Sequence, residues 1–202
     1  SSYQPDCWQE KQGQLAPSTS FTNHTSSDWA DDGFANDGGS GSARININGT
    51  SCKDWLISPS IDLSGGNYQL EYDIALTGHD GTADSSLSSD DSFAVIISTD
   101  DGVTWSNSNI LKVYGPSSDI PNQAFHDIIS LSSYSTTVKI GFYAKSSVSN
   151  TNTDLFIDNF EVKAIPSCQP VYNQSATNID TSTATLNWSE FGSSTTWNIE
   201  YK

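Results

Sequence analysis

Two adjacent aspartates, Asp90 and Asp91, open the stretch DDSFAVIISTDDGVTW at residues 90–105. They follow a serine-rich loop and lead into an apolar run that must be buried. Neighbouring carboxylates beside a buried strand repel each other unless a cation or a hydrogen-bond donor neutralises them. Asp91 is therefore a candidate ligand for Ca²⁺. The alternative is a solvated loop in which Asp90 only forms a turn.

The other end of the stretch, residues 98–105, reads STDDGVTW. Aspartate and glycine supply the backbone geometry that a chain reversal needs, and Trp105 would begin the next strand facing the core. We therefore predict that this end is a structural hairpin and not a chemical site.

A second group of aspartates lies among glycines in DWADDGFANDGGSGS, residues 28–42. The ligand order of an EF-hand is absent, so the likeness to a calcium loop is loose. A β-sandwich usually takes calcium ligands from separate loops. Asp31, Asp32 and Asp37 are therefore candidate ligands that acids from elsewhere would have to complete.

Signatures of catalysis are missing from the sequence. It contains no G-x-S-x-G, no H-E-x-x-H and no Cys–His signature. A glycosidase needs two carboxylates about 5–10 Å apart, but acids are so abundant here that their presence discriminates nothing. The histidines are scattered and the cysteines match no zinc spacing. We expect a protein without catalytic activity.

Sugar binding needs a flat aromatic ring and hydrogen-bonding side chains on a rigid sheet. In TVKIGFYAK (137–145), Tyr143 and Lys145 alternate with an apolar face, and Glu71 and Asp73 do so in YQLEYDIAL (68–76). We predict that these four residues bind a glycan if their strands are neighbours. Further aromatic candidates in loops are Trp29, Tyr114 and Tyr134, whereas Trp55 and Trp105 sit in apolar patterns typical of a core.

Strand signals dominate the chain, and turn clusters rich in Gly, Asp, Ser and Asn separate them. SFAVIIS (92–98) is apolar on both faces, which predicts a central strand. No segment shows a helical period. These features predict an all-β fold, an antiparallel β-sandwich, whose expected strands are 43–48, 54–63, 68–76, 92–98, 137–145 and 155–163.

Three motifs in a fixed order, WLISP, STDDGVTW and IDNFEV, carry a resemblance to the MAM-like and cleaved-adhesin domains of secreted bacterial multidomain proteins. The resemblance covers roughly residues 5–164. It implies a jelly-roll-like sandwich that binds sugars or proteins, often with structural Ca²⁺, and has no catalysis of its own. It also favours Asp158 as a calcium ligand, since an acid in an otherwise apolar strand is unfavourable unless it is paired.

A second unit begins near IPSCQP (165–170), so we place the domains at 1–166 and 167–202. TSTATLNW (181–188) and TTWNIEYK (195–202) resemble the first strands of a fibronectin type III domain, with Trp188 closing one strand and Glu200-Tyr201 ending another. We interpret this unit as an incomplete fibronectin type III-like segment.

Cysteine pairing stays open at the level of sequence. Cys7, Cys52 and Cys168 allow one disulfide. A Cys7–Cys168 bond would tie the first strand to the exit of the domain, Cys7–Cys52 is the rival, and three reduced thiols are the third possibility.

The chain of 202 residues carries 24 acidic and 8 basic side chains, a net charge of −16. That field opposes nucleic acid and anionic membranes as partners. No apolar run of 18 residues exists, so we expect no membrane insertion. Acidity and abundant Ser, Thr and Asn suit a secreted or cell-surface protein.

Two functions compete for such a module. The first is binding of a polysaccharide, preferably a neutral one because polyanions would approach against the charge. The alternative is protein–protein adhesion, or a spacer module of a secreted protease or surface adhesin. In either case we expect a monomer whose other partners are domains of the parent protein.

Overall fold

The computed structural model describes residues 7–22, 28–39, 41–166, 171–190 and 195–199. The chain divides into two compact units, residues 1–163 and 164–202. No helix within the described residues is both long and apolar enough to cross a membrane. Cys7 is exposed, Cys52 is buried, and both are free thiols; Cys168 lies outside the described residues.

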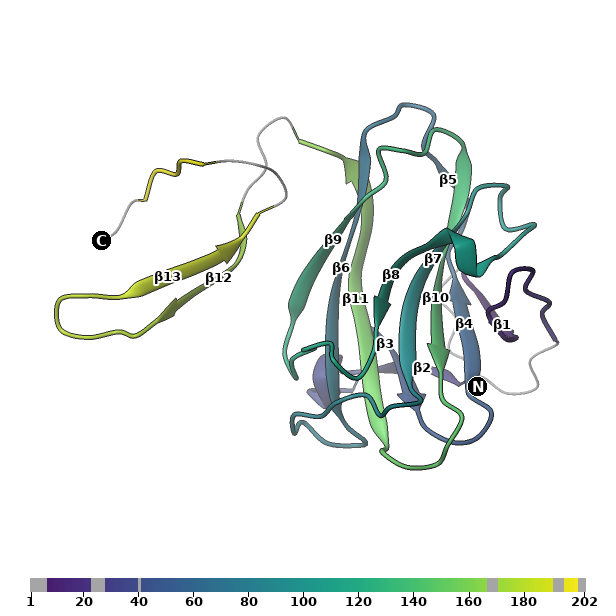
Figure 1. Ribbon diagram of the computed structural model, residues 1–202, viewed down its shortest axis with the longest axis horizontal. Coiled ribbons are helices and arrows are strands. Elements are labelled where there is room, and N and C mark those ends of the chain that lie inside the picture. The colour runs from purple at the N-terminus through teal and green to yellow at the C-terminus, as the bar shows by residue number, and fades with distance from the viewer. Residues whose placement is uncertain (1–6, 23–27, 40, 167–170, 191–194, 200–202) are drawn as a thin grey trace. The chain divides into compact units, whose positions relative to one another are not determined.

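The first unit is a sandwich of two sheets, which confirms the predicted all-β class (Figure 1). Its strands pair antiparallel and mostly with partners distant in sequence, as in a jelly roll. The six-stranded sheet has the order β1 (Gln9–Gln12), β4 (Lys53–Ile57), β10 (Thr137–Lys145), β7 (Ser92–Ser98) and β8 (Ile110–Tyr114), with β5 (Ile61–Asp62) also paired to β10. The five-stranded sheet has the order β2 (Trp29–Asp32), β3 (Ser42–Ile47), β11 (Thr153–Ala164), β6 (Tyr68–Gly78) and β9 (Phe125–Ser130).

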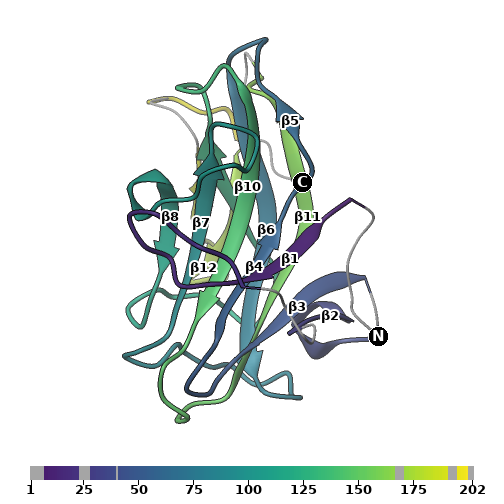
Figure 2. The ribbon, with the colours of Figure 1, turned by 90° about the vertical axis from the view of Figure 1, so that its right-hand side faces the viewer.

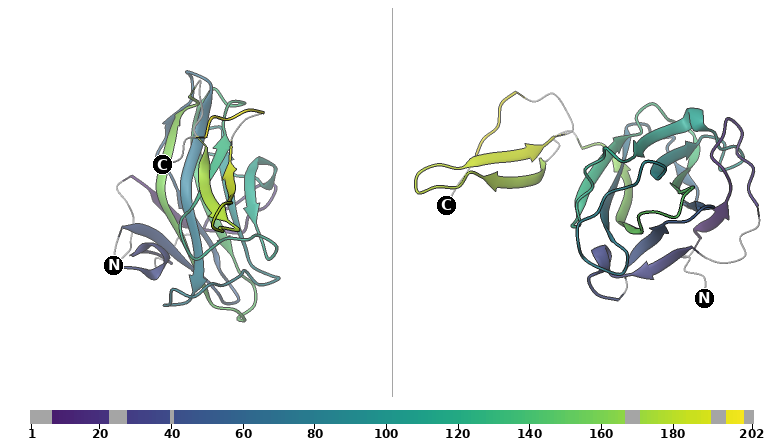
Figure 3. Two further views of the ribbon diagram at one scale, coloured as in Figure 1. Left: turned by 90° about the vertical axis from the view of Figure 1, so that its left-hand side faces the viewer. Right: turned by 60° about the horizontal axis from the view of Figure 1, so that its bottom comes forward.

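The main core lies between the two sheets, which Figure 3 shows as separate layers. Alternation along the strands builds it, because every second side chain of a strand points to the same face. Leu70, Tyr72 and Ile74 of β6 point into this core, as the sequence predicted. From the opposite sheet come the inward residues of β7, among them Phe93 and Val95.

A second core covers the outer face of the six-stranded sheet. Trp55, Trp105 and Tyr143 are buried there, together with the other face of β7, beneath Leu15 and Phe21. Backbone hydrogen bonds fix the covering segment, residues 13–22, to the sheet. Both faces of β7 are therefore buried, which confirms it as an interior strand.

The hairpin prediction for residues 98–105 is confirmed. Asp100 accepts hydrogen bonds from the Ser98 hydroxyl at 2.7 Å and from both the amide and the hydroxyl of Thr104. Asp101 and Gly102 supply the positive-φ backbone of the turn. Trp105 is buried, as expected, but it does not begin the next strand: a short 3₁₀ turn, η2 (Asn107–Asn109), follows and β8 starts at Ile110.

The side of the sandwich where β8 faces β9 is closed by a buried polar network. The Asp127 carboxylate accepts from the hydroxyls of Tyr114 and Tyr72 and pairs with Lys112. Burial raises the pKa values of both tyrosines, so their hydroxyls stay neutral donors. The network joins the two sheets at this side.

The second unit contains a two-stranded sheet of β12 (Tyr172–Thr177) and β13 (Thr185–Ser189). Trp188 packs edge-on against Trp197, with ring centroids 5.3 Å apart. The predicted end of a third strand at Glu200-Tyr201 lies outside the described residues. The fibronectin type III interpretation stays a prediction.

Candidate functional site

The structure corrects the prediction that Tyr143 offers an exposed platform for a sugar ring. Its side chain is only 2% exposed because the segment 13–22 covers this face of β10. The Tyr143 ring lies 4.7 Å from that of Trp55. Two of the loop aromatics, Trp29 and Tyr114, are also buried, whereas Tyr134 is half-buried.

The four predicted glycan residues do not come together either. Tyr143 and Lys145 belong to β10 in the six-stranded sheet, whereas Glu71 and Asp73 belong to β6 in the five-stranded sheet. The condition that their strands be neighbours is therefore not met. These residues cannot form one site.

Glu71 and Asp73 instead take part in a paired network on the outer face of the five-stranded sheet. His126 lies 2.8 Å from Asp73 and 3.2 Å from Glu71, and Lys163 lies 2.7 Å from Glu71. Burial raises the pKa of Glu71, but hydrogen bonds from Lys163 and Gln69 outweigh it and leave the pKa below its ordinary value. This face is held together by its own charges.

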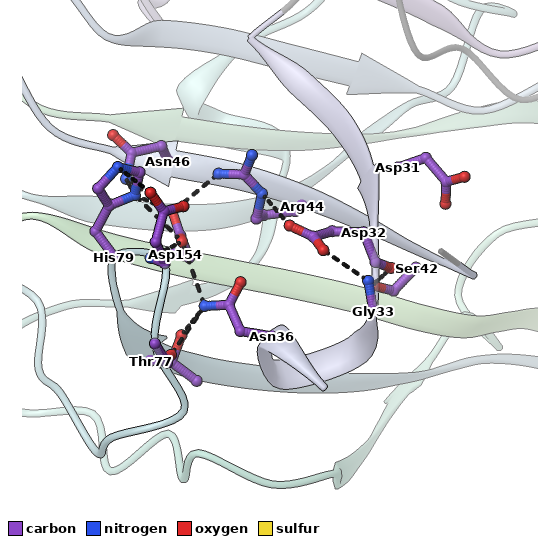
Figure 4. Close-up of polar contacts among 12 residues, drawn as sticks. Asp31, Asp32, Gly33, Asn36, Ser42, Arg44, Asn46, Thr77, His79 and Asp154 are labelled. Atoms are coloured by element: carbon purple, nitrogen blue, oxygen red, sulfur yellow. Dashed lines mark hydrogen bonds and ion pairs between the residues drawn. The ribbon is translucent and has the colours of Figure 1, made fainter. Parts of the chain in front are cut away.

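Arg44, the only arginine of the chain, forms the centre of a second polar cluster on the same sheet (Figure 4). Its Nε lies 2.8 Å from Asp32 Oδ2 as an ion pair without the alignment of a hydrogen bond. Its guanidinium also donates to Asp154 Oδ1 at 3.1 Å. The arginine therefore neutralises two carboxylates from two different strands.

Asp154 is fully buried and its carboxylate is surrounded by donors. Besides Arg44 it accepts from Asn46 at 2.8 Å, from the Asp80 amide at 2.9 Å, and contacts His79 at 3.2 Å. Burial raises the pKa of Asp154, but these hydrogen bonds and the arginine charge outweigh it, so the pKa is lowered overall. The carboxylate is ionised and ties the 79–80 turn to β3 and β11.

The five predicted calcium ligands are spread over the sandwich. Among the described residues, only His79, Asp80 and Asp154 bring three His, Cys, Asp or Glu ligand atoms within 4.8 Å of one another, and Asp154 is already neutralised by Arg44. The predicted ligands do not fit one calcium centre, and calcium binding stays a prediction of the sequence. Those ligands are Asp31, Asp32, Asp37, Asp91 and Asp158.

Each of these carboxylates has its own surroundings. Asp31 accepts the Gly41 amide at 2.8 Å, and Asp32 accepts the Gly33 amide and pairs with Arg44. Asp37 is exposed beyond the short turn η1 (Phe34–Asn36). Asp91 accepts a hydrogen bond from the backbone amide of Ser88, three residues earlier in the chain. Asp158 accepts one from the backbone amide of Asn159.

Asp90 serves the fold as an anchor for the loop that follows β10. Its Oδ2 accepts the amides of Ser147 at 2.9 Å and Val148 at 2.7 Å, and Oδ1 accepts the Asn150 side chain. The Ser147 hydrogen bond above all lowers the pKa of Asp90 to about 2. The predicted alternative, a solvated turn former, is therefore incomplete, since this carboxylate binds a second loop.

We expect Asp90→Asn to lower stability at neutral pH. The lowered pKa means that the wild-type contribution is full above an unfolded pKa near 3.8 and is lost as the pH falls through about 2. The difference in unfolding free energy between the two proteins should therefore close between pH 4 and pH 2, as measured by urea unfolding. Asp84→Asn, an exposed change in the preceding loop, is the control. A difference that does not depend on pH would contradict this role.

On the side of the sandwich opposite the Asp127 network, the edge strand β1 faces β2 and β3 (Figure 2). The structure has two hollows there. The first, which we call the aromatic pocket, has a volume of about 120 Å³. Trp8 packs edge-on against Phe160 at 5.0 Å and stacks over Phe142 at 6.3 Å. Polar groups reach the same hollow from a bend in β11, where Asn159 has a positive φ. The chief lining residues are Trp8, Phe142, Ile157, Asp158, Asn159 and Phe160.

The second hollow, which we call the polar pocket, has a volume of about 200 Å³. It lies toward the other end of the same strands, where Gln12 of β1 donates to the buried Asp54 of β4 at 3.1 Å. No lysine or arginine of the described part of the chain lines it. Its lining residues are Gln12, Asp28, Asn46, Asn48, Ser51, Cys52 and Asp54.

Sequence reasoning missed the roles of Arg44 and Trp8. A lone arginine in an acidic chain is a detectable signal, because a buried carboxylate must find a counter-charge and few are available here. Trp8 comes directly before β1, and only the edge position of that strand shows that the ring faces a hollow.

Comparisons with known proteins find no family model and no curated protein that matches the sequence. Several solved structures are similar to it. The K1 cleaved adhesin domain of Lys-gingipain from Porphyromonas gingivalis W83 is 16% identical over 80% of this chain and 93% of that one, with a TM-score of 0.48. The K3 domain of the same protein is 13% identical over the same shares, with a TM-score of 0.46.

A carbohydrate-binding module is also among the similar structures. The family 30 module of a cellulosomal cellulase of Clostridium thermocellum is 14% identical over 76% of this chain and 90% of that one, with a TM-score of 0.46. These three structures are β-sandwich domains, two of them cleaved adhesin domains and one a carbohydrate-binding module. The MAM-like assignment stays a prediction.

Proposed function

We propose that this protein is a non-catalytic module that binds a neutral glycan in the aromatic pocket. One observation carries the proposal: an open hollow at the sandwich edge combines aromatic rings with a carboxylate and an amide. Sugar rings present an apolar face and a rim of hydroxyl groups, and such a lining matches both. We place the module outside the cell, as part of a larger secreted protein.

Asp158 supplies the polar part of the recognition. Its Oδ1 is held by the Asn159 amide at 2.7 Å, and its Oδ2 has no partner among the described residues. That oxygen can accept a hydrogen bond from a sugar hydroxyl. Asn159 is itself oriented by Asp73, which accepts its side-chain amide at 2.7 Å. Asp73, predicted as a sugar ligand, thus positions Asn159, which lines the pocket.

Charge favours a neutral ligand over an acidic one. Among the described residues, Asp158 is the only ionisable one that lines the aromatic pocket, and the chain carries a net charge of −16. A sulfated or uronate-rich chain would therefore meet repulsion both at a distance and in the site. A single carboxylate also lacks the second acid that glycoside hydrolysis requires. The pocket is suited to binding and not to turnover.

Replacing Trp8 by alanine should weaken binding of neutral glucan or galactan oligosaccharides about 10- to 100-fold, since burying one large apolar side chain is worth about 1.5–3 kcal/mol. Isothermal titration calorimetry would measure the change. Asp158→Asn should weaken binding less and keep the fold, while Trp197→Ala, in the second unit, is the matched control. Undiminished binding by a folded Trp8→Ala variant would contradict the site.

Protein adhesion is the second candidate, and the second unit favours it. Among the described residues of this unit, four large apolar side chains are exposed: Ile179, Leu186, Trp197 and Ile199. Exposed apolar groups in one small unit are typical of a surface that meets another protein or domain. Retention of a partner domain that Leu186→Asp abolishes, with glycan binding absent, would favour this function.

A further inference from the structure

We propose that the polar pocket is a second subsite for the same ligand, so that the module binds a chain of neutral sugar units along the open side of the sandwich. The inference rests on the proposed function of the aromatic pocket. It adds a second contact region with a different chemistry, and it predicts that affinity rises with the length of the glycan.

The two pockets lie along the same pair of strands. Trp8, directly before β1, lines the aromatic pocket, and Gln12, at the end of β1, lines the polar pocket. In β4, Leu56 lines the first and Asp54 the second. Four residues of extended strand span about 13 Å. That distance exceeds one sugar ring, so a single ligand must contain several units to reach both pockets.

The lining of the polar pocket selects a hydroxyl-rich neutral group. An anion is opposed by Asp28 and Asp54, and the lining residues that the structure describes include no lysine or arginine. A metal ion is opposed because Asp28, Cys52 and Asp54 do not form a group of ligand atoms within 4.8 Å. Every side chain of the lining is polar or a thiol, so a purely apolar ligand would find no apolar surface to cover.

Free hydrogen-bonding groups of both kinds remain at this pocket. Asn48 uses its Oδ1 to accept the Gly49 amide at 2.7 Å, and its amide nitrogen has no partner among the described residues. Gln12 donates through Nε2 to Asp54, and its Oε1 has no partner among them either. A donor and an acceptor that line the same pocket match a sugar hydroxyl, which both donates and accepts.

The buried carboxylate of Asp54 keeps the Gln12 side chain in place. Its Oδ1 holds Gln12, and its Oδ2 accepts the amide of Lys53 at 2.9 Å. Both oxygens are therefore engaged inside the protein and Asp54 acts as a positioning residue. Recognition falls to Gln12 and Asn48, which makes these two the residues to vary.

The test compares glucan and galactan oligosaccharides of one to four units on the full chain by calorimetry. The wild type should bind the four-unit chain at least about 10-fold more tightly than the single unit. Gln12→Ala and Asn48→Ala should each remove about 2- to 10-fold of that gain, the value of one hydrogen bond, and leave single-unit affinity unchanged. Gln123→Ala, an exposed change on a distant loop, is the control.

The outcomes separate the two proposals. Suppose that Trp8→Ala abolishes binding, while Gln12→Ala and Asn48→Ala still bind the four-unit chain more tightly than the single unit by the wild-type factor. The proposal of a second subsite is then wrong, and the proposal for the aromatic pocket is supported. If Trp8→Ala has no effect while Asn48→Ala reduces binding, the polar pocket binds alone and the proposed function loses its site. If no oligosaccharide of any length binds, both are overturned.

Discussion

Replacing Arg44 by methionine should lower the free energy of unfolding by about 3–5 kcal/mol, the loss expected when a buried ion pair is left with one partner. Asp154 is fully buried, and Arg44 neutralises both this carboxylate and that of Asp32. Methionine keeps much of the side-chain volume, so the loss reports the charge and not a cavity. Urea unfolding followed by tryptophan fluorescence would measure it.

The same variant tests what Arg44 does at this site. With the guanidinium gone, Asp32 and Asp154 become two carboxylates without a counter-ion, and added Ca²⁺ should recover part of the lost stability in Arg44→Met. The wild type should respond less, because its arginine already supplies the positive charge. Arg44→Lys, which keeps the charge but not the fork that reaches both acids, should fall between them. A loss below 1 kcal/mol in Arg44→Met would contradict the role of the arginine as the central counter-charge.

Replacing Trp105 by alanine should lower the free energy of unfolding by about 3–5 kcal/mol, the usual loss for a large aromatic side chain in a core. Trp105 packs against Trp55 with ring centroids 5.4 Å apart, and its neighbourhood is so dense that a Cβ on Gly141 would lie 2.8 Å from it. The indole also donates to the Gly102 carbonyl at 3.1 Å. Loss of this ring would leave the second core open.

Val103 is the matched control on the same hairpin. It lies two residues before Trp105 but its side chain is 80% exposed, so Val103→Ala should change the unfolding free energy by no more than about 0.5 kcal/mol. Equal losses from the two variants would show that the hairpin, and not the second core, determines the effect. Chemical denaturation at one temperature is sufficient for the comparison.

The sheet architecture could be predicted because alternation and turn chemistry are local. Tyr72 and Ile74 point into the core, as the alternating pattern predicts. The Asp100 carboxylate accepts hydrogen bonds within the turn that the Asp and Gly residues of 98–105 predict. The length of the turn region after Trp105 could not be predicted, since the 3₁₀ turn before β8 depends on contacts with residues 13–22.

The candidate site was harder to predict because a periodic pattern identifies the face of a strand and not what covers it. Tyr143 does point away from the main core, but residues 13–22 bury it on the other face. Glu71 and Asp73 lie on an outward face of the other sheet, a fact of topology that spacing along the chain does not contain. The aromatic pocket combines Trp8 with Asp158, which are 150 positions apart in the sequence.

The central claim is that a neutral glycan binds along the side of the sandwich where β1 faces β3, and an NMR titration tests it most directly. A ¹⁵N-labelled sample titrated with a four-unit neutral oligosaccharide should show the largest shifts at the Trp8 indole, the Asn159 side chain and the Asn48 side chain. The resonances of His126 and Lys163, on the outer face of the five-stranded sheet, should stay in place. Shifts confined to that outer face, with Trp8 and Asn48 unchanged, would contradict the claim.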